Sequence, residues 1–332
     1  MKVWDLHCDT LSELRYAEQA GRPKSFAQND LMIDLTRMKQ ADYLLQCMAC
    51  FVYLNPEREK DPLLACMEQI DIFDRLLEQY PDDLMPVRSA ADIAALKTSG
   101  KIGMMLTVEE GGVCLDSPGV LRDLYRMGVR MMTLTWNFKN GLAEPNAVPG
   151  DASTVWPCAA NTTGGLTPRG FEFVEEMERL HMILDVAHLS DAGIRDVLRV
   201  AKRPFAASHS NARACCPHVR NLTDEMLRAM GEKGCLIGLN YCASFLDNNP
   251  DRSHLKARIT DMARHACHIM DLAGEDSLAL GSDFDGIGGD LEIAGAEDMP
   301  RLAEGLVREG IPSHVVEKIF HGNAERFFAE NL

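Results

Sequence analysis

The sequence predicts a single (β/α)8 barrel, and three observations on the 332-residue chain favour it. Eight short apolar runs alternate with longer segments in which apolar residues recur at helical spacing. Most of the runs are apolar at successive positions, as in parallel strands that are covered on both faces. The length fits one barrel, which takes about 250 residues or more, and no linker divides residues 1–332 into two domains.

Predicted strands and helices alternate along the chain. The predicted strands are 2–8, 43–52, 101–109, 128–136, 182–188, 203–210, 235–241 and 277–285. The clearest predicted helices are 62–80, 117–128, 167–180, 190–201, 223–234 and about 253–273. Four of these helices open on Ser or Thr followed by Pro or Asp, which is typical of a helix start. Strands separated by helices form a parallel sheet, and eight such repeats close a barrel.

The charge of the chain limits its partners. With 34 Lys and Arg against 50 Asp and Glu, the net charge is −16 at pH 7. Nucleic acids and anionic membrane surfaces favour clustered Lys and Arg, so neither is expected as the main partner. No apolar run reaches the roughly 18 residues of a membrane span. The first predicted strand begins at residue 2, so we expect no cleavable signal peptide.

The cysteines predict a reducing, cytoplasmic compartment. The chain has 11 cysteines, an odd number, and many lie within apolar segments. This pattern indicates buried thiols more than a disulfide framework. Cys47 and Cys50 form a C-x-x-C in a predicted strand, where residues three apart point to opposite faces. We expect both to pack in the core, and neither to bind a metal.

Histidines and carboxylates gather where the predicted strands end. They are His7, Asp9, Glu109, Glu110, Asp185, His188, His209, Asp283 and Asp285. In a barrel, the C-terminal ends of all strands meet around one mouth. Such groups packed together need a positive charge between them, which one or two divalent cations would supply. Nitrogen and oxygen donors without thiolate suit a catalytic zinc, and a carboxylate such as Glu109 can bridge two ions.

Two of these groups, His7 and Asp9, lie at the end of the first predicted strand, and a further carboxylate, Asp5, precedes them. Asp5, His7 and Asp9 alternate, so on a strand they face the same side. His7 and Asp9 lie nearest to the C-terminal end and can reach one ion. Asp5 lies deeper, as an interior residue or one that supports the ligands. Cys8 points to the opposite face and is not an expected ligand.

A segment at 137–166 is rich in Gly, Pro and Asn and has no clear period. It follows the fourth predicted strand, where a barrel places its active-site loops. Long loops of this kind in a compact domain are usually functional. We therefore expect residues 137–166 to contribute to the site.

Several ordered motifs resemble one known family. They are "DLHCDT" (5–10), "VEEGG" (108–112), "GVLRDLYRMGVRMMTLTWN" (119–137), "LDVAHLS" (184–190), "SHSNARACCPHVRNLTDEML" (208–227), "GSDFDG" (281–286) and "GNAERFF" (322–328). The chain resembles the membrane dipeptidase (renal dipeptidase-like) zinc peptidases, peptidase family M19, which are amidohydrolase-type barrels. The resemblance spans nearly the full chain.

The resemblance implies a site with two zinc ions. His7 and Asp9 would hold one ion, and His188 and His209 the other. A glutamate that opens an E-G-G in the family would bridge them. Counted without gaps from "GVLR" and "TLT", that position falls on Glu109, with Glu110 as the alternative.

The resemblance also implies residues that handle the substrate. Arg220 would hold the substrate's carboxylate, because a guanidinium binds a carboxylate through two hydrogen bonds. Asp283 would move the proton between water and the leaving amine. Tyr241 would contact the substrate weakly. Asp285 would be structural.

One position departs from the family pattern. The renal-type enzymes follow "TLT" with a histidine that contacts the scissile carbonyl, whereas this chain has Trp136. An indole N–H is a donor only. Three alternatives stay open: Trp136 replaces the histidine, a loop residue such as Asn137 or Lys139 does so, or the substrate range differs.

The expected function is that of a zinc-dependent dipeptidase. A hydroxide shared by two zinc ions would attack the peptide carbonyl of a dipeptide, and the resemblance implies that D-residues are tolerated at the second position. One alternative is a hydrolase with the same metal site that acts on N-acyl amino acids, cyclic amides or lactones. Another is a metal-binding protein that has lost catalysis. The sequence leaves a homodimer open.

Overall fold

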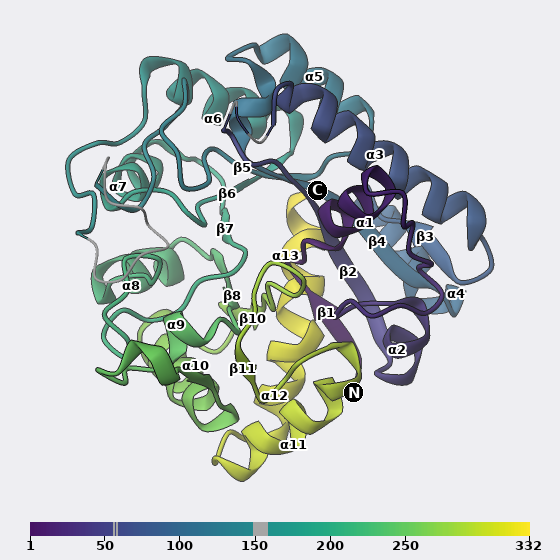
Figure 1. The fold of residues 1–332 in the computed structure, drawn as a ribbon. Helices are drawn as coiled ribbons and strands as arrows, with labels where there is room; N and C mark the ends of the chain where they lie inside the picture. Colours follow the sequence, from purple (N-terminus) through teal and green to yellow (C-terminus); the bar gives the residue numbers. More distant parts are fainter. Residues whose placement is uncertain (56, 58, 149–158) are drawn as a thin grey trace.

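Nine parallel strands form the central sheet of the computed structural model, which describes residues 1–55, 57, 59–148 and 159–332 (Figure 1). They are β1 (Val3–Asp5), β2 (Tyr43–Phe51), β3 (Leu84–Pro86), β4 (Ile102–Glu109), β5 (Met131–Thr133), β6 (Ile183–Asp185), β7 (Ala206–Ala207), β8 (Leu236–Leu239) and β10 (Leu278–Leu280). Their order is β2-β1-β10-β8-β7-β6-β5-β4-β3. Because β2 also pairs with β4, all of these strands except β3 close a barrel.

The predicted barrel is confirmed, and each of the eight predicted strands contains one of its strands. β3 is an addition that the sequence did not predict. It pairs with Ile102, Gly103 and Met104, whereas β5 pairs further along β4 with Thr107 and Val108. β3 therefore lies on the same side of β4 as β5, nearer to the N-terminal end of β4. It has only three residues, too few for a periodic pattern.

Helices surround the barrel (Figure 1). They are α1 (Thr10–Gln19), α2 (Leu35–Gln40), α3 (Pro62–Gln79), α4 (Ala90–Ser99), α5 (Pro118–Arg126), α6 (Pro168–Leu180), α7 (Asp191–Val200), α8 (Asp224–Glu232), α9 (Ala243–Leu246), α10 (Ile259–Ala273), α11 (Met299–Arg308), α12 (Ser313–Glu317) and α13 (Asn323–Asn331). Within the described part of the chain, no helix combines the length and apolar character needed to cross a bilayer.

Three of the four helix starts predicted from Ser or Thr have side-chain caps, whereas Ser117 before α5 makes no capping hydrogen bond. Thr167, Ser190 and Thr223 each accept a hydrogen bond from a backbone N–H in the first turn of the helix that follows. These bonds satisfy donors that the helix itself leaves unpaired. The helix predicted from residue 253 is shorter, because a 3-10 turn (Arg252–His254) and β9 (Lys256–Ala257) precede α10. β9 pairs instead with β11 (Asp290–Leu291).

Two apolar layers hold the barrel together. The inner cluster takes residues from every strand of the barrel: Trp4, Leu6, Leu45, Cys47, Met105, Met131, Ile183, Ala206, Leu236 and Ala279. Phe327 and Phe328 of α13 join it, and Phe328 stacks on Trp4 with ring centroids 5.6 Å apart. The outer cluster lies between the strands and the helices and includes Cys50. The predicted core positions of Cys47 and Cys50 on opposite faces are thus confirmed.

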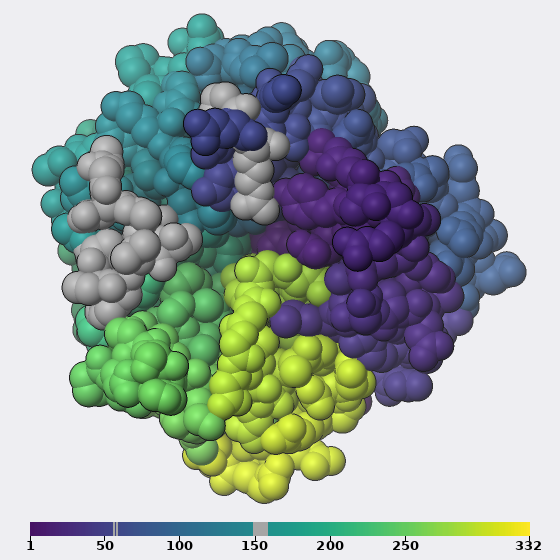
Figure 2. All heavy atoms as spheres, viewed as in Figure 1, coloured from purple at the N-terminus to yellow at the C-terminus, as the bar shows by residue number. Residues whose placement is uncertain are grey.

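The first and last strands of the barrel, β1 and β10, pair at one seam. The backbone N–H of Asp9 donates to the carbonyl oxygen of Phe284 at 2.8 Å. In the space-filling view, the N-terminal segment (purple) and the segment after β10 (yellow-green) lie side by side near the centre of the face (Figure 2). Residues at opposite ends of the sequence can therefore contribute to one site.

His265 joins α10 to two loops on the β7–β8 side of the barrel. The backbone N–H of Ala212 donates to Nδ1 of His265 at 3.1 Å, so Nε2 carries the proton and donates to the carbonyl oxygen of Leu246 at 3.2 Å. Burial lowers the pKa of His265 to about 4. The folded protein therefore holds this imidazole neutral, whereas the unfolded chain protonates it near its ordinary pKa of about 6.5.

We expect stability to fall as the pH drops from about 6.5 to 4, because the unfolded chain binds a proton in this window and the folded chain does not. His265 alone contributes up to about 3 kcal/mol to this loss. The variant His265→Gln should lose less stability over the window than the wild type. Urea unfolding of the metal-free protein at pH 7.5 and 4.5 measures the difference. The exposed His314→Gln is the control, and parallel losses in wild type and His265→Gln would contradict the assignment.

Candidate active site

A cavity of about 410 Å³ opens at the polar end of the barrel. Residues at the C-terminal ends of all eight barrel strands, or in the segments that follow them, line it: Asp9, Ser12, Glu13, Tyr16, Phe51, Tyr53, Glu109, Trp136, Asn137, His188, His218, Arg220, Cys242, Ser244, Phe245, Asp283, Asp285, Gly286, Ile287 and Gly288. The apolar inner cluster fills the barrel below it. The cavity is thus the mouth at which the sequence placed the site.

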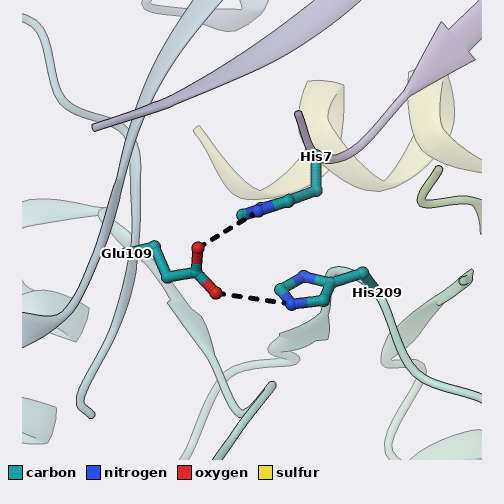
Figure 3. A group of neighbouring side chains, drawn as sticks. All are labelled: His7, Glu109 and His209. Atoms are coloured by element: carbon teal, nitrogen blue, oxygen red, sulfur yellow. Dashed lines mark ion pairs between the residues drawn. The ribbon is translucent and has the colours of Figure 1, made fainter. Parts of the chain in front are cut away.

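Glu109 lies at the centre of three imidazoles. Its Oε2 is 3.3 Å from Nε2 of His7, and its Oε1 is 2.9 Å from Nε2 of His188 and 3.4 Å from Nε2 of His209. Figure 3 shows the carboxylate between His7 and His209, with one oxygen toward each ring. All four side chains are buried. The two oxygens of Glu109 therefore face different groups of nitrogen donors.

Asp9 and Asp283 complete the group around His7. Nε2 of His7 lies 3.8 Å from Oδ2 of Asp9 and 3.9 Å from Oδ1 of Asp283. Asp9 is the N-cap residue of α1, but its side chain makes no capping hydrogen bond. Its carboxylate is therefore directed to the cavity and not to the helix.

Hydrogen bonds at Nδ1 fix two of the imidazoles. The Ser208 hydroxyl donates to Asp185, so its oxygen accepts from Nδ1 of His209, 2.8 Å away. The amide oxygen of Asn137 accepts from Nδ1 of His188 at 2.9 Å. Both rings therefore carry their proton on Nδ1 and present the Nε2 lone pair to Glu109.

Hydrogen bonds also hold Asp283 and the residue before it, Ser282. Asp5 accepts from the backbone N–H of Ser282 at 2.8 Å and also from its hydroxyl. Asn240 donates to Oδ2 of Asp283 at 2.9 Å.

Asp283 and His188 have φ of 65° and 68°, a left-handed conformation that is uncommon for residues other than glycine. Such backbone strain persists only where the surroundings impose it, and it concentrates at functional sites.

The electrostatics of the protein groups alone are unfavourable. Burial raises the pKa of Asp9 to about 7, and the charge of Glu109 adds to the rise. Burial also raises the pKa of Asp283 to about 6, although a nearby imidazole opposes the change. Burial and a nearby guanidinium lower the pKa of His188 to about 3. Asp9, Asp283 and His188 are thus driven toward their neutral forms, whereas, against the effect of burial, Glu109 raises the pKa of His7 and the imidazoles lower the pKa of Glu109. A cation beside the cluster would favour the ionised carboxylates.

These residues fit a bound cation. Nε2 of His188 and Nε2 of His209 lie 2.9 Å apart, and both present lone pairs. Nε2 of His7 and Oδ1 of Asp9 are buried without a hydrogen-bond partner. Ligand atoms of His7, Glu109 and His209 all lie within 4.8 Å of one another, as do those of His7, Asp9 and Asp283. Nitrogen and oxygen donors of this kind suit zinc or a similar divalent metal.

Glu110 points away from this cluster. Its carboxylate accepts hydrogen bonds from the backbone N–H of Gly112 and of Trp136, both at 2.8 Å, and from the amide of Asn140. Glu109, by contrast, follows Met105 and Thr107 on the inner face of β4, where alternate residues point the same way. Of the two glutamates, Glu109 is the one that meets the histidines.

Arg220 lies in the cavity wall and is 4% exposed. One guanidinium nitrogen donates to the carbonyl oxygen of His209 at 3.1 Å, and Nε has no partner. No ion pair among the described residues includes Arg220. Burial lowers its pKa, although carboxylates including Asp283 oppose this effect. A buried cation with unused donors is suited to bind an anionic ligand group.

Trp136, Asn137 and Lys139 are the candidates to replace the family histidine, and the structure places them in different surroundings. Trp136 lines the cavity, with its ring 5.7 Å from that of His188. Asn137 lines it too and holds His188. Lys139 is exposed and forms an ion pair with Glu144 at 2.7 Å, so it is outside the cluster.

Tyr241 requires a correction, because the structure contradicts its expected contact with the substrate. Its side chain is fully buried, with the hydroxyl 4.0 Å from the sulfur of Met299 and the ring packed edge-on against Phe284. It shares the outer face of its strand with Leu239, whereas Asn240 faces the site. The alternation along the strand therefore directs Tyr241 into the core.

The sequence predicted that strand alternation brings His7 and Asp9 together, but the structure shows a different cause. β1 ends at Asp5, so His7 and Asp9 lie beyond the strand, after a bend at Leu6. They approach through this bend and not through strand alternation. Asp5 instead orders Ser282, in keeping with a supporting position. Asp285 accepts hydrogen bonds from Thr10 and from the backbone of residue 32, both at 2.6 Å, which fits a structural part.

The segment 137–166 reaches the site through Asn137, while Asn146 bonds the carbonyl oxygen of His188 at 3.0 Å. Residues 149–158 of the predicted loop lie outside the described residues. The sequence reasoning missed Ser208 and Ser282. Each stands directly before a candidate functional residue and one strand away from a buried Asp, which is the signal that would have found them.

A family model described as membrane dipeptidase, peptidase family M19, matches residues 1–331. The chain belongs to this family. It is therefore a metallo-dipeptidase-type hydrolase, and family membership implies a bound metal ion. The full-length match agrees with the site at the barrel mouth.

Individual relatives agree with the M19 assignment. An uncharacterised dipeptidase of Schizosaccharomyces pombe is 35% identical over 268 residues, which are 76% of this chain and 61% of that protein. The crystal structure of dipeptidase AC, a family M19 metallopeptidase, shares 25% identity with a TM-score of 0.89, covering 100% of this chain and 98% of that one. A metallopeptidase from Rhodobacter sphaeroides, liganded with a phosphinate mimic of the dipeptide L-Ala-D-Ala, has the same fold, with 23% identity, a TM-score of 0.87 and coverage of 100% and 99%.

Asp185→Asn should weaken zinc affinity by about 10- to 100-fold, because it disturbs the hydroxyl that sets the His209 tautomer. Competition with a chromophoric chelator measures this affinity. Asp224→Asn, in which the changed carboxylate pairs with His268 outside the cavity, is the matched control. An affinity equal to the control's would show that Asp185 does not orient the ligand.

Proposed function

We propose that the M19 chain is a dipeptidase with two zinc ions. His7 and Asp9 would hold one ion, His188 and His209 the other, and Glu109 would bridge them. The observation that carries this proposal is the position of Glu109, whose two oxygens face different nitrogen donors. The facing lone pairs of His188 and His209 support a second cation beside Oε1.

The residues of the chain would divide the work of amide hydrolysis. Zinc, when bound, supplies a Lewis acid for the carbonyl oxygen and lowers the pKa of water. Asp283, steadied by Asn240, would take the proton from the attacking water and give it to the leaving amine. Its raised pKa suits a group that must both accept and donate a proton. Burial of the cluster excludes bulk water and strengthens these interactions.

Arg220 would bind the C-terminal carboxylate of the substrate. Its guanidinium lines the cavity and has an unpaired donor. Because one end of the substrate is fixed there, the peptide bond that reaches the ligand cluster is the one next to the C-terminal residue. A cavity of about 410 Å³ suits a small substrate, and together these features favour dipeptides.

Acceptance of a D-residue at the second position is also part of the proposal. The support is indirect: a structure with the same fold binds a mimic of L-Ala-D-Ala. Trp136 would take part in substrate binding at the position of the family histidine. Hydrolysis of N-acyl amino acids, cyclic amides or lactones is the main rival, and a parallel assay of these compounds against L,L- and L,D-dipeptides separates the two.

Further proposals concern the protein as a whole. We propose one domain over residues 1–332, a dipeptide as the substrate and no nucleic-acid or membrane partner, in keeping with the charge of −16. A cytoplasmic location agrees with the free thiols of ten described cysteines. A homodimer is the oligomeric state to test by light scattering.

Protein loaded with zinc and then freed of excess metal should retain about two ions per chain, and His209→Ala about one, since a bridging carboxylate and separate nitrogen donors form two sites. Mass spectrometry of the metal content measures this ratio. Chelation should abolish dipeptide hydrolysis, and zinc should restore it. The exposed His254→Ala is the control for a lost imidazole. One ion or none in the wild type would contradict the two-ion site.

Arg220→Met should raise KM for dipeptides by about 10- to 100-fold, with a smaller change in kcat, because it removes a charge-assisted hydrogen bond to the substrate. The wild type should discriminate against dipeptide amides, and the variant should not. Steady-state kinetics with both substrates measures this difference. Arg228→Met, at an exposed position of α8, is the control. An unchanged preference for the free carboxylate would remove this role from Arg220.

A further inference from the structure

Four aromatic side chains pack together, three of them at the cavity mouth and Phe138 behind them, and we call them the aromatic wall: Phe51, Tyr53, Trp136 and Phe138. Trp136 is central, with ring centroids 5.0 Å from Phe51, 5.3 Å from Tyr53 and 5.7 Å from Phe138. Tyr53 and Phe138 also pack edge-on at 5.0 Å. Contacts of this length are those of a packed aromatic cluster.

The aromatic wall presents apolar surface to the cavity. Phe51, Tyr53 and Trp136 line it, and none of them is fully buried. Large aromatic residues elsewhere, such as Trp4 and Phe327, are buried in the core. Apolar surface left open in a cavity beside converging polar groups is typical of a binding site for an apolar ligand group.

The wall is also held in place before any substrate binds. The carboxylate of Glu110 accepts the backbone N–H of Trp136 at 2.8 Å and also the amide of Asn140. Asn140 in turn caps the loop by accepting from the backbone N–H of Leu142 at 2.8 Å. Trp136 therefore needs little reordering to receive a ligand, and such preorganisation favours affinity.

Phe51 and Tyr53 of the wall lie across the barrel from Arg220, while Trp136 and Phe138 follow β5, two places from β7 in the ring. Phe51 ends β2 and Tyr53 follows it, whereas Arg220 follows β7. In the closed ring of eight strands, β2 and β7 are four places apart in either direction. The ligand cluster lies between them: Trp136 is 5.7 Å from His188 by ring centroids, and the backbone of His209 bonds Arg220.

We infer that the aromatic wall is the subsite for the side chain of the substrate's amino-terminal residue, and that it selects bulky apolar side chains. This inference rests on the proposed dipeptidase function. With the carboxylate at Arg220 and the peptide bond at the Glu109 cluster, the amino-terminal residue extends toward the opposite side of the mouth. Trp136 is then a specificity residue at that end of the substrate.

The charges of the cavity support the same selection. Among its described lining residues, Glu13 and Asp285 are acidic groups outside the metal cluster, and Arg220 is the only Lys or Arg. With that one guanidinium assigned to the terminal carboxylate, a second carboxylate on the substrate would meet acidic groups. The inferred substrates are therefore dipeptides with a bulky apolar first residue, and those with Asp or Glu first are poor substrates.

The test compares Phe-Ala with Gly-Ala and Glu-Ala, which share the carboxylate half. The wild type should favour Phe-Ala over Gly-Ala by about tenfold or more in kcat/KM, as expected of a large apolar side chain in a matching pocket. Trp136→Ala should lower this ratio by about tenfold, and Tyr53→Ala, from another strand, should also lower it. Tyr125→Ala, an aromatic truncation on α5, should leave the ratio unchanged.

A binding measurement separates this inference from the proposed function. Calorimetry on the zinc-loaded protein would use two phosphinate dipeptide mimics that differ only in a benzyl group or a hydrogen at the first residue. Failure to hydrolyse any dipeptide would refute the proposed function, while tighter binding of the benzyl compound, lost in Trp136→Ala, would still support the subsite. Equal dissociation constants, or a kcat/KM ratio that Trp136→Ala leaves intact, would overturn it.

Discussion

A buried carboxylate between three imidazoles is the interaction on which this site depends. Glu109 is 3% exposed and contacts nitrogen atoms from three separate segments. Ionisable groups so close together would move apart in a flexible scaffold. Here the apolar inner cluster fixes the strands beneath them, and Asp185, Asn137 and Asn240 hold the side chains from behind. The barrel therefore maintains an arrangement that a bound cation would stabilise.

Much of this arrangement could be predicted from the sequence, because topology does most of the positioning. Once eight apolar runs are recognised as parallel strands, the residues that follow them must meet at one mouth. That reasoning brought His7, Glu109, His188, His209 and Asp283 together from distant segments. Strand alternation likewise separated Glu109 from Glu110 and Cys47 from Cys50. These inferences need only the rule that successive side chains of a regular strand point to opposite faces.

The inferences that failed have different physical causes. Asp5, His7 and Asp9 alternate in the sequence, but the strand ends and the chain bends before His7. The alternation of strand faces therefore no longer applies there. Tyr241 follows a strand as other site residues do, yet it continues the outer face of Leu239. The aromatic wall could not be foreseen, because Phe51 and Trp136 meet only through loop conformations that Glu110 helps to set. Periodicity carries no information on such tertiary contacts.

The contact between Asp5 and Ser282 has a consequence for biosynthesis. The two residues are 277 positions apart, and their hydrogen bonds close the seam between the first strand and the last. During translation, β1 leaves the ribosome early and must wait, unpaired on one edge, for nearly the whole chain. A truncated or stalled product therefore lacks both the seam and Asp283. Exposed strand edges are prone to aggregate, so the growing chain is exposed to this hazard until β10 is made.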